Sequence, residues 1–414
     1  MMPKLNRLQA AFAIVLLLAL SGCIRDKVTR QYTIKTPVFA TKESILTNIK
    51  ATAARSISET GKIYWYGKWI FLNEPGRGIH IVDNTNPASP SIKAFIELPG
   101  TQDIAVKGNI LYADLFNDML AIDIRNPLEP VLKKRLPNIF PDRQYVAGYY
   151  VDSSMVIVDW VSKDTVVDAE TNMWGLPGFG CTNCFMANSE GGSIKASNGQ
   201  GGSMARFAIV NEFLYAVSEW DLSTISISTA YDPVKIGSKP MGWGIETVYP
   251  FRDKLFIGSS TGMFIADISN GADPVLAGGF SHARACDPVV ADEKFAYVTL
   301  RTGNACIGTQ NQLDILDVAN ISAPSLVKTY PMTNPHGLGI RSNHLYLCDG
   351  RDGLKVLDVT DKLNVRLQQK INLSDAFDVI VNQDLLLVVA GDGLYQFRIA
   401  ENGNLSALSS IKTN

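Results

Sequence analysis

The sequence predicts an all-β protein, a β-propeller of about eight, or seven, four-stranded blades. One short phrase recurs, in which an acidic residue at the end of an apolar run precedes a proline by seven positions. The phrases lie about 40 residues apart, and each follows two strand-like runs joined by a turn. A four-stranded unit of this length is typical of a propeller blade, because stacking such sheets around an axis buries both faces of each sheet.

The recurrent phrase reads as the end of one strand followed by a turn. The acidic residue and proline pairs with this spacing are Asp83–Pro90, Asp123–Pro130, Asp267–Pro274 and Asp317–Pro324. Ser226 replaces the acid before Pro233, and Asp358 keeps the phrase without the proline. Asp, Asn and Ser side chains bond to nearby backbone in turns. We therefore expect the acidic residue to cap the turn between the third and fourth strands of a blade, which is a structural role.

The spacing of the phrases gives the length of a blade and locates two insertions. The intervals 83 to 123, 226 to 267 and 317 to 358 are 40, 41 and 41 residues. The interval from 267 to 317 is 50 residues, which predicts an insertion near 302–311. The interval from 123 to 226 is 103 residues, which leaves room for two units and a long Gly- and Ser-rich insertion at 169–203.

Each unit is expected to begin with a hairpin of apolar, aromatic and β-branched residues around a tight turn. The hairpin of 286–301 is followed by an alternating run, LDILDV, and by an outer strand, SLVKTYP. Eight stretches fit the inner hairpin: 63–74, 104–115, 149–160, 207–219, 247–259, 286–301, 338–350 and 379–391. The stretch 149–160 lacks a clear outer half, which is why seven blades remain an alternative.

The N-terminus predicts export and a lipid anchor. Lys4 and Arg7 precede an apolar run at 10–20, which is about half as long as a membrane-spanning helix and fits a secretory signal peptide. The following LSGC stretch resembles the bacterial lipobox. That resemblance implies cleavage before Cys23 and acylation, for example by palmitate, of the new N-terminal residue.

The chain accordingly divides into three parts. We expect a signal peptide at 1–22, an anchor linker and N-terminal segment at 23–60, and the propeller with its insertion at 61–412. A short helix is expected at 41–48, with Thr41 as its N-cap.

The charge of the mature chain argues against nucleic acid as a partner. Removing Lys4 and Arg7 from 38 basic residues leaves 36 against 40 acidic residues, a formal net charge of −4. No polybasic patch is present for nucleic acid or for an anionic membrane surface. We expect a monomer in the bacterial cell envelope, lipid-anchored at the outer membrane or the periplasmic face rather than in the cytoplasm.

Several stretches resemble the LVIVD repeat family of exported bacterial proteins. The phrases LDILDV (313–318) and LKVLDV (354–359) carry the resemblance, which covers most of 60–400. Other stretches resemble a lipoprotein branch of that family: GGSMARFA (201–208), HARACDPVVAD (282–292), NQLDILDV (311–318) and NPHGLGI (334–340). The resemblance implies a β-propeller and brings no established reaction, so it predicts the fold and leaves the function open.

The cysteines after Cys23 are candidates for disulfides, which export permits. Cys286 precedes an inner strand and Cys306 follows the strand paired with it, so a bridge between them would fix the 302–311 insertion. Cys181 and Cys184 form one CTNC motif, for which we expect a local disulfide because no second pair completes a zinc site. Cys348 falls within a strand and is expected to be a buried thiol.

No catalytic signature such as GxSxG, HExxH or a phosphate-binding loop occurs in the sequence. His80 and His344 lie in or beside strands, where we expect them to pack. The connections 241–246, 281–288 and 333–339 and the loop 300–303 are predicted to meet on one face of the propeller. They would gather seven candidate binding residues there: Trp243, Glu246, His282, Arg284, Asp287, Arg301 and His336. A solvated loop surface with salt bridges is the alternative.

These features favour a lipid-anchored envelope propeller that binds a protein or a glycan through its loop face. One alternative is a hydrolase or lyase with a site on that face or in the channel, and another is a structural envelope scaffold. A divalent ion in the channel would favour the enzyme, whereas clustered exposed aromatic side chains would favour binding. No cofactor and no metal ion are predicted.

Overall fold

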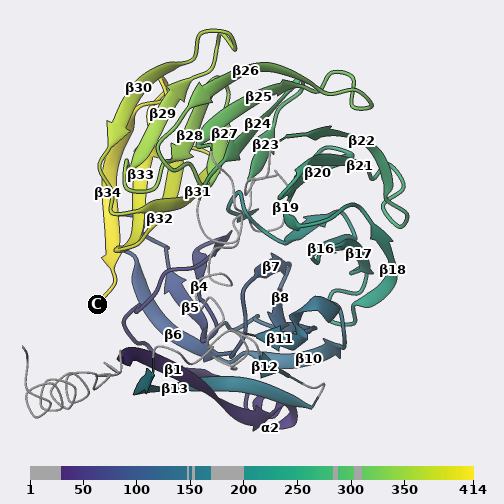
Figure 1. The fold of residues 1–414 in the computed structure, drawn as a ribbon, viewed down its shortest axis with the longest axis vertical. Helices are drawn as coiled ribbons and strands as arrows, with labels where there is room; N and C mark the ends of the chain where they lie inside the picture. The colour runs from purple at the N-terminus through teal and green to yellow at the C-terminus, as the bar shows by residue number, and fades with distance from the viewer. Residues whose placement is uncertain (1–28, 147–148, 152–153, 169–199, 283–287, 303–309) are drawn as a thin grey trace, which may run out of the picture.

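A computed structural model describes residues 29–146, 149–151, 154–168, 200–282, 288–302 and 310–414. Seven four-stranded sheets stand around a central axis, like the blades of a propeller (Figure 1). The predicted fold is confirmed, with the smaller of the two expected blade numbers. Each blade is built from four consecutive strands, and the first of them lies nearest the axis.

The first three blades contain the strands that surround the longest interruption of the repeat. Blade 1 comprises β3 (Ile63–Tyr66), β4 (Trp69–Glu74), β5 (Gly78–Asp83) and β6 (Ser91–Glu97). Blade 2 comprises β7 (Ile104–Lys107), β8 (Ile110–Leu115), β9 (Asp118–Asp123) and β10 (Val131–Leu136). Blade 3 comprises β15 (Phe207–Val210), β16 (Phe213–Val217), β17 (Asp221–Ser226) and β18 (Val234–Pro240).

The last four blades follow one another with short connections. Blade 4 comprises β19 (Ile245–Phe251), β20 (Lys254–Ser259), β21 (Gly262–Asp267) and β22 (Val275–Ser281). Blade 5 comprises β23 (Val289–Ala291), β24 (Phe295–Leu300), β25 (Gln312–Asp317) and β26 (Ser325–Pro331). Blade 6 comprises β27 (Leu338–Arg341), β28 (His344–Cys348), β29 (Leu354–Asp358) and β30 (Arg366–Ile371). Blade 7 comprises β31 (Ala376–Asn382), β32 (Leu385–Ala390), β33 (Gly393–Ile399) and β34 (Leu405–Lys412).

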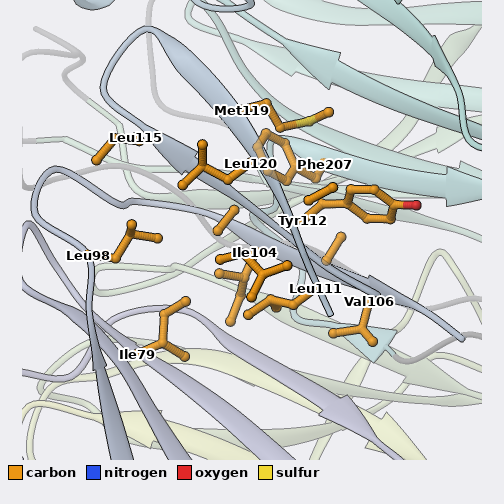
Figure 2. Close-up of a cluster of buried hydrophobic side chains, with 14 of the residues drawn as sticks. Ile79, Leu98, Ile104, Val106, Leu111, Tyr112, Leu115, Met119, Leu120 and Phe207 are labelled. Atoms are coloured by element: carbon orange, nitrogen blue, oxygen red, sulfur yellow. The ribbon is translucent and has the colours of Figure 1, made fainter. Parts of the chain in front are cut away.

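The core of the protein lies between the blades. All six residues of β8 are buried, whereas four of the six residues in the outer strand β30 are exposed and the other two are half-buried. Figure 2 shows apolar side chains of blades 1, 2 and 3 meeting in one cluster. The inner strands are therefore nearly continuous in apolar residues because both of their faces are covered by neighbouring sheets.

The recurrent acidic residue has the structural role that the sequence predicts. Asp317 Oδ1 accepts the N–H of Ala319 at 2.9 Å, immediately after the third strand of blade 5. The corresponding oxygens of Asp83, Asp123, Asp267 and Asp358 accept the N–H two positions on, at 2.8–3.0 Å. These bonds fix the turn into the fourth strand, as short polar side chains commonly do.

Buried tyrosines connect neighbouring blades at the same turns. Tyr112 of blade 2 donates its hydroxyl to Ala230 O of blade 3 at 2.7 Å. Tyr215 and Tyr346 make the equivalent bonds to the turn of the next blade, at 2.8 and 3.1 Å. A tyrosine suits this place because its ring fills the space between two sheets while its hydroxyl satisfies a turn carbonyl.

The ring closes between blade 7 and blade 1 without sharing a strand. Ile57 forms a parallel bridge with Thr413, and Thr60 Oγ1 donates to Ala390 O at 2.9 Å. The side-chain amides of Asn84 and Gln396 exchange two hydrogen bonds, at 3.0 and 2.7 Å. Apolar side chains from both blades pack beneath these contacts.

The segment before blade 1 contains more structure than a linker with one helix. β1 (Thr29–Thr41) pairs along its length with β13 (Met155–Asp168), and β2 (Ala51–Ala53) extends blade 1 beside β6. Between them, α2 (Lys42–Leu46) confirms the expected helix, with Thr41 Oγ1 accepting Ser44 N–H at 3.3 Å. Within the described part of the chain, no helix is long and apolar enough to span a membrane.

The hairpin expected at 149–160 is not a blade. β12 (Tyr149–Tyr150) pairs with β11 (Tyr145–Val146), and the rest of the stretch begins β13. The β1–β13 ribbon lies against the outside of the ring beside blade 2 (Figure 1). Among the described residues, blade 3 is therefore the one blade found where the spacing left room for two units. Alternation of apolar residues shows a two-sided strand, but it cannot tell a blade hairpin from a ribbon whose partner strand is remote.

Most of the predicted cysteine chemistry lies outside the described residues. This applies to Cys23, Cys181, Cys184, Cys286 and Cys306, and to 169–199 of the predicted insertion. Cys348 is fully buried within β28, as expected. His80 is also fully buried, with Nε2 2.6 Å from Glu74 Oε2, which confirms its packing role.

Candidate functional site

The chain returns to the centre of the ring before it enters blade 3. We call residues 200–206 the axial segment. Its first two residues form β14 (Gln200–Gly201), which pairs with the innermost strand of blade 1. Ser203 then bonds to two further blades: its N–H donates to Asp378 Oδ1 at 3.0 Å, and its Oγ accepts the N–H of Leu338 at 2.5 Å. The axial segment thus joins blade 1 to blades 6 and 7.

Two glycines permit this close approach. A Cβ atom on Gly202 would lie 1.8 Å from Asp378 Oδ2. A Cβ atom on Gly337 would lie 2.8 Å from Asp378 Oδ1 and 2.9 Å from Ser203 Oγ. Packing at the axis therefore requires Gly202 in the GGSMARFA stretch and Gly337 in the NPHGLGI stretch.

Charged side chains lie in and around the axial segment. Lys62, Asp103, Arg206 and Asp378 each stand immediately before a buried apolar residue of the innermost strand, in blades 1, 2, 3 and 7. Lys62 Nζ lies 2.8 Å from Asp103 Oδ2. That oxygen also accepts the N–H groups of Arg206 and, at 3.1 Å, of Phe207. Asp103 therefore holds blades 1, 2 and 3 together at the axis.

Burial shifts the pKa of two of these groups. Desolvation lowers the pKa of Lys62 to about 8, although the Asp103 carboxylate opposes the shift. Desolvation raises the pKa of Asp378 well above its ordinary value, and the nearby Lys62 charge opposes this only in part. Asp378 Oδ1 accepts two backbone N–H bonds, whereas Oδ2 has no hydrogen-bond partner. The raised pKa favours the protonated form of the Asp378 carboxyl group.

Three of the predicted face residues come together near the axis. Glu246 lies in β19, Arg301 follows β24, and His336 precedes β27. Desolvation raises the pKa of Glu246 to about 7, against the opposing charges of Arg301 and Arg206. Glu246 is half-buried and keeps some solvent exposure. Burial and the Arg301 charge lower the pKa of His336 well below its ordinary value, which keeps this imidazole neutral.

The other predicted residues are placed differently. Trp243 is 37% exposed and meets Trp220, which is 51% exposed, with ring centroids 6.3 Å apart and an interplanar angle of 61°. His282 ends blade 4, where its N–H donates to Thr261 O at 3.3 Å. Arg284 and Asp287 lie outside the described residues.

Sequence reasoning missed the axial charges and Trp220. A signal was available, because aligning the inner hairpins places Lys62, Asp103, Arg206 and Asp378 at one position. Trp220 stands in the loop between the second and third strands of blade 3, on the predicted loop face. Across the described residues, no group of three or more His, Cys, Asp and Glu side chains is arranged to hold a metal ion.

The raised pKa of Glu246 predicts a pH-dependent stability. The folded protein holds the Glu246 proton more tightly than the unfolded chain does, so this stabilisation is complete below pH 4.5 and is lost as the pH rises to about 7. In urea titrations, the free energy of unfolding should fall between pH 5 and pH 8 by about 2–3 kcal/mol more in the wild type than in Glu246→Gln. Glu401→Gln, at an exposed position, serves as the control. Equal pH dependence in wild type and Glu246→Gln would contradict the assignment.

Known proteins resemble this chain in repeat and in fold. Three segments match the LVIVD repeat, at residues 100–136, 255–281 and 283–332. No curated protein matches the sequence.

Solved structures share the fold at low sequence identity. A protein from Lactobacillus plantarum is 14% identical, with a TM-score of 0.53 over 86% of this chain and 96% of that one. BamB from Moraxella catarrhalis is 8% identical, with a TM-score of 0.50 over 88% of this chain and 97% of that one. A chain of the Mitotic Checkpoint Complex is 13% identical, with a TM-score of 0.54 over 85% of this chain and 95% of that one. The chain thus contains LVIVD repeats and folds as a seven-bladed β-propeller.

Proposed function

We propose that the protein is a lipid-anchored component of the bacterial cell envelope that binds a partner protein through the loop face of its propeller. The observation that carries this proposal is the exposed pair of Trp220 and Trp243. Surface loops on a rigid scaffold are common places for recognition, and tryptophan is enriched among residues that dominate binding energy.

The tryptophan pair is held in place by the backbone. The N–H of Met241 donates to Trp220 O at 3.1 Å, and the N–H of Ile245 donates to Glu219 O at 3.1 Å. These bonds join the two loops that carry the rings. A pre-organised pair loses little conformational entropy on binding, so more of its buried area contributes to affinity.

The geometry favours a protein over a glycan. The rings meet edge to face, so they form an angled apolar surface and not one flat plane for stacking against a sugar. The similar chain in the Mitotic Checkpoint Complex belongs to an assembly, which supports the use of this fold within complexes. A glycan partner remains the second outcome of the same test.

The binding role is tested by replacing both rings. Trp220→Ala with Trp243→Ala should weaken binding to the native partner by a factor of about 30 or more, because truncating a hot-spot residue costs about 2 kcal/mol or more. A photo-crosslinking residue at position 243 should join the propeller to that partner in intact cells. Tyr231→Ala is the matched control, because Tyr231 is 61% exposed in a turn of the opposite face. Equal crosslinking from positions 231 and 243 would contradict the proposal.

The lipid anchor is tested separately. Cys23→Ser should move the protein from the membrane fraction to the soluble fraction, because acyl chains supply the membrane affinity. β1 begins six residues after Cys23, so the anchor would hold the propeller close to the bilayer. Mass spectrometry of the wild type should find acyl groups on Cys23. An unmodified mature N-terminus at another residue would overturn the anchor and leave the binding role to be judged on its own test.

A further inference from the structure

Two buried arginines near the axis have hydrogen-bond donors that find no partner among the described residues. Arg143 lies in η1 (Pro141–Gln144), which follows blade 2 in the chain, and is 8% exposed. Its Nη1 pairs with Asp114 Oδ2, whereas Nε and Nη2 are buried without a hydrogen-bond partner. Its guanidinium carbon lies 4.2 Å from the centroid of the Phe140 ring.

Arg206 ends the axial segment and is 9% exposed. Its Nε is buried without a hydrogen-bond partner, and among the described residues no carboxylate oxygen comes within 4.0 Å of its guanidinium. Two buried aspartates of this region already hold other cations, since Asp103 pairs with Lys62 and Asp114 pairs with Arg143. Asp142, Glu246 and Asp103 act on the Arg206 guanidinium only through space.

The two guanidinium groups are neighbours. The Phe140 ring, which Arg143 covers, stacks on the Phe207 ring with centroids 5.6 Å apart and an interplanar angle of 14°. Phe207 directly follows Arg206 in the chain, so this aromatic pair links the Arg143 guanidinium to the residue next to Arg206. Their proximity also shows in the pKa of Arg206, which is lowered by desolvation first and then by the Arg143 charge.

Such an arrangement is unfavourable unless a third group completes it. Buried donors without partners are unfavourable, and like charges in a desolvated site repel. A water molecule could accept hydrogen bonds but would leave the repulsion in place, and a metal cation would increase it. An oxyanion satisfies both requirements, because its oxygens accept several hydrogen bonds and its charge offsets the second guanidinium.

We propose that Arg143 and Arg206 form a binding site for an oxyanion, either free or as the phosphate, sulfate or carboxylate group of a larger ligand. The site is independent of the lipid anchor and of the tryptophan pair. The Phe140 ring lies against the Arg143 guanidinium and both arginines are buried, which strengthens charge-assisted hydrogen bonds to the anion.

Calorimetric titration of the purified full chain tests the site with inorganic phosphate, sulfate and acetate at constant ionic strength. We expect saturable binding of at least one anion with one site per chain. Preference for phosphate or sulfate would assign a tetrahedral group, and preference for acetate would assign a carboxylate. Absence of saturable binding by all three anions would overturn the proposal.

Conservative variants show whether the arginine pair is responsible. Arg143→Lys and Arg206→Lys keep the charge but lose the planar fork, so each should weaken binding at least tenfold. Arg398→Lys is the matched control, because Arg398 forms only an exposed pair with Asp384 and should leave affinity unchanged. Unchanged affinity in both site variants would contradict the proposal.

A crystal structure of the wild type, grown in the presence of the anion that binds, tests the proposal even if a variant does not fold. We expect the anion between the two guanidinium groups, within hydrogen-bond distance of Arg143 Nη2 and Arg206 Nε. Water molecules alone at this place, or a direct ion pair between Asp142 and Arg206, would overturn the assignment.

Discussion

Replacing Asp103 with Ala is expected to lower the free energy of unfolding by about 3–5 kcal/mol, which is typical of breaking a buried ion pair from one side. Lys62 would remain buried without its counter-charge. The N–H groups of Arg206 and Phe207 would also lose their acceptor, and with them the junction between blades 2 and 3. The loss is large because the uncompensated groups cannot reach water in the folded protein.

Chemical denaturation of wild type and Asp103→Ala at pH 7 measures this loss. Asp384→Ala is the control, because Asp384 pairs with Arg398 at an exposed site, where an ion pair contributes at most about 1 kcal/mol. A loss of the same size in both variants would show that the carboxylate at the axis has no special part in holding the blades together.

Replacing Gly202 with Ala is expected to cost about 1–3 kcal/mol, the usual range for an added methyl group in a packed interior. The new Cβ would overlap the Asp378 carboxyl group, which is buried and bonded to Ser203 N–H and Val379 N–H. The axial segment must therefore move away from blade 7, and amide hydrogen exchange at Ser203 and Leu338 should become faster.

Gly237→Ala is the matched control for that substitution. Gly237 lies in the outer strand of blade 3, and its Cβ would meet no atom within 4 Å. It should unfold like the wild type. If Gly202→Ala were equally harmless, the axial segment would be packed more loosely than the contacts of Gly202 indicate.

Local chemistry explains which parts of the fold the sequence predicts correctly. The acidic turn residues and the helix N-cap act on backbone groups two or three positions away, so their function is visible in a short window. The inner hairpins are also local, because their two strands are joined by a tight turn. These features specify the blade, and the repeated spacing then specifies a ring of blades.

The wrong assignment at 149–160 marks the limit of that reasoning. β13 pairs with β1, more than one hundred residues earlier in the chain, and its alternating pattern is the same as that of a blade strand. Nothing local distinguishes the two partners. The choice depends on packing against blade 2, for example through the buried ion pair between Lys42 Nζ and Asp118 Oδ2 at 2.9 Å.

The sequence by itself determined the blade, the approximate length of the repeat and the loops that carry Glu246, Arg301 and His336 on one face. Only the tertiary structure decided that seven blades close the ring, that residues 200–206 cross its centre, and that Trp220 meets Trp243. It also decided which charges are buried, because Lys62, Asp103 and Arg206 come from three different blades. Ring closure brings together residues that are remote in the chain, and their burial and electrostatics exist only once the ring has formed.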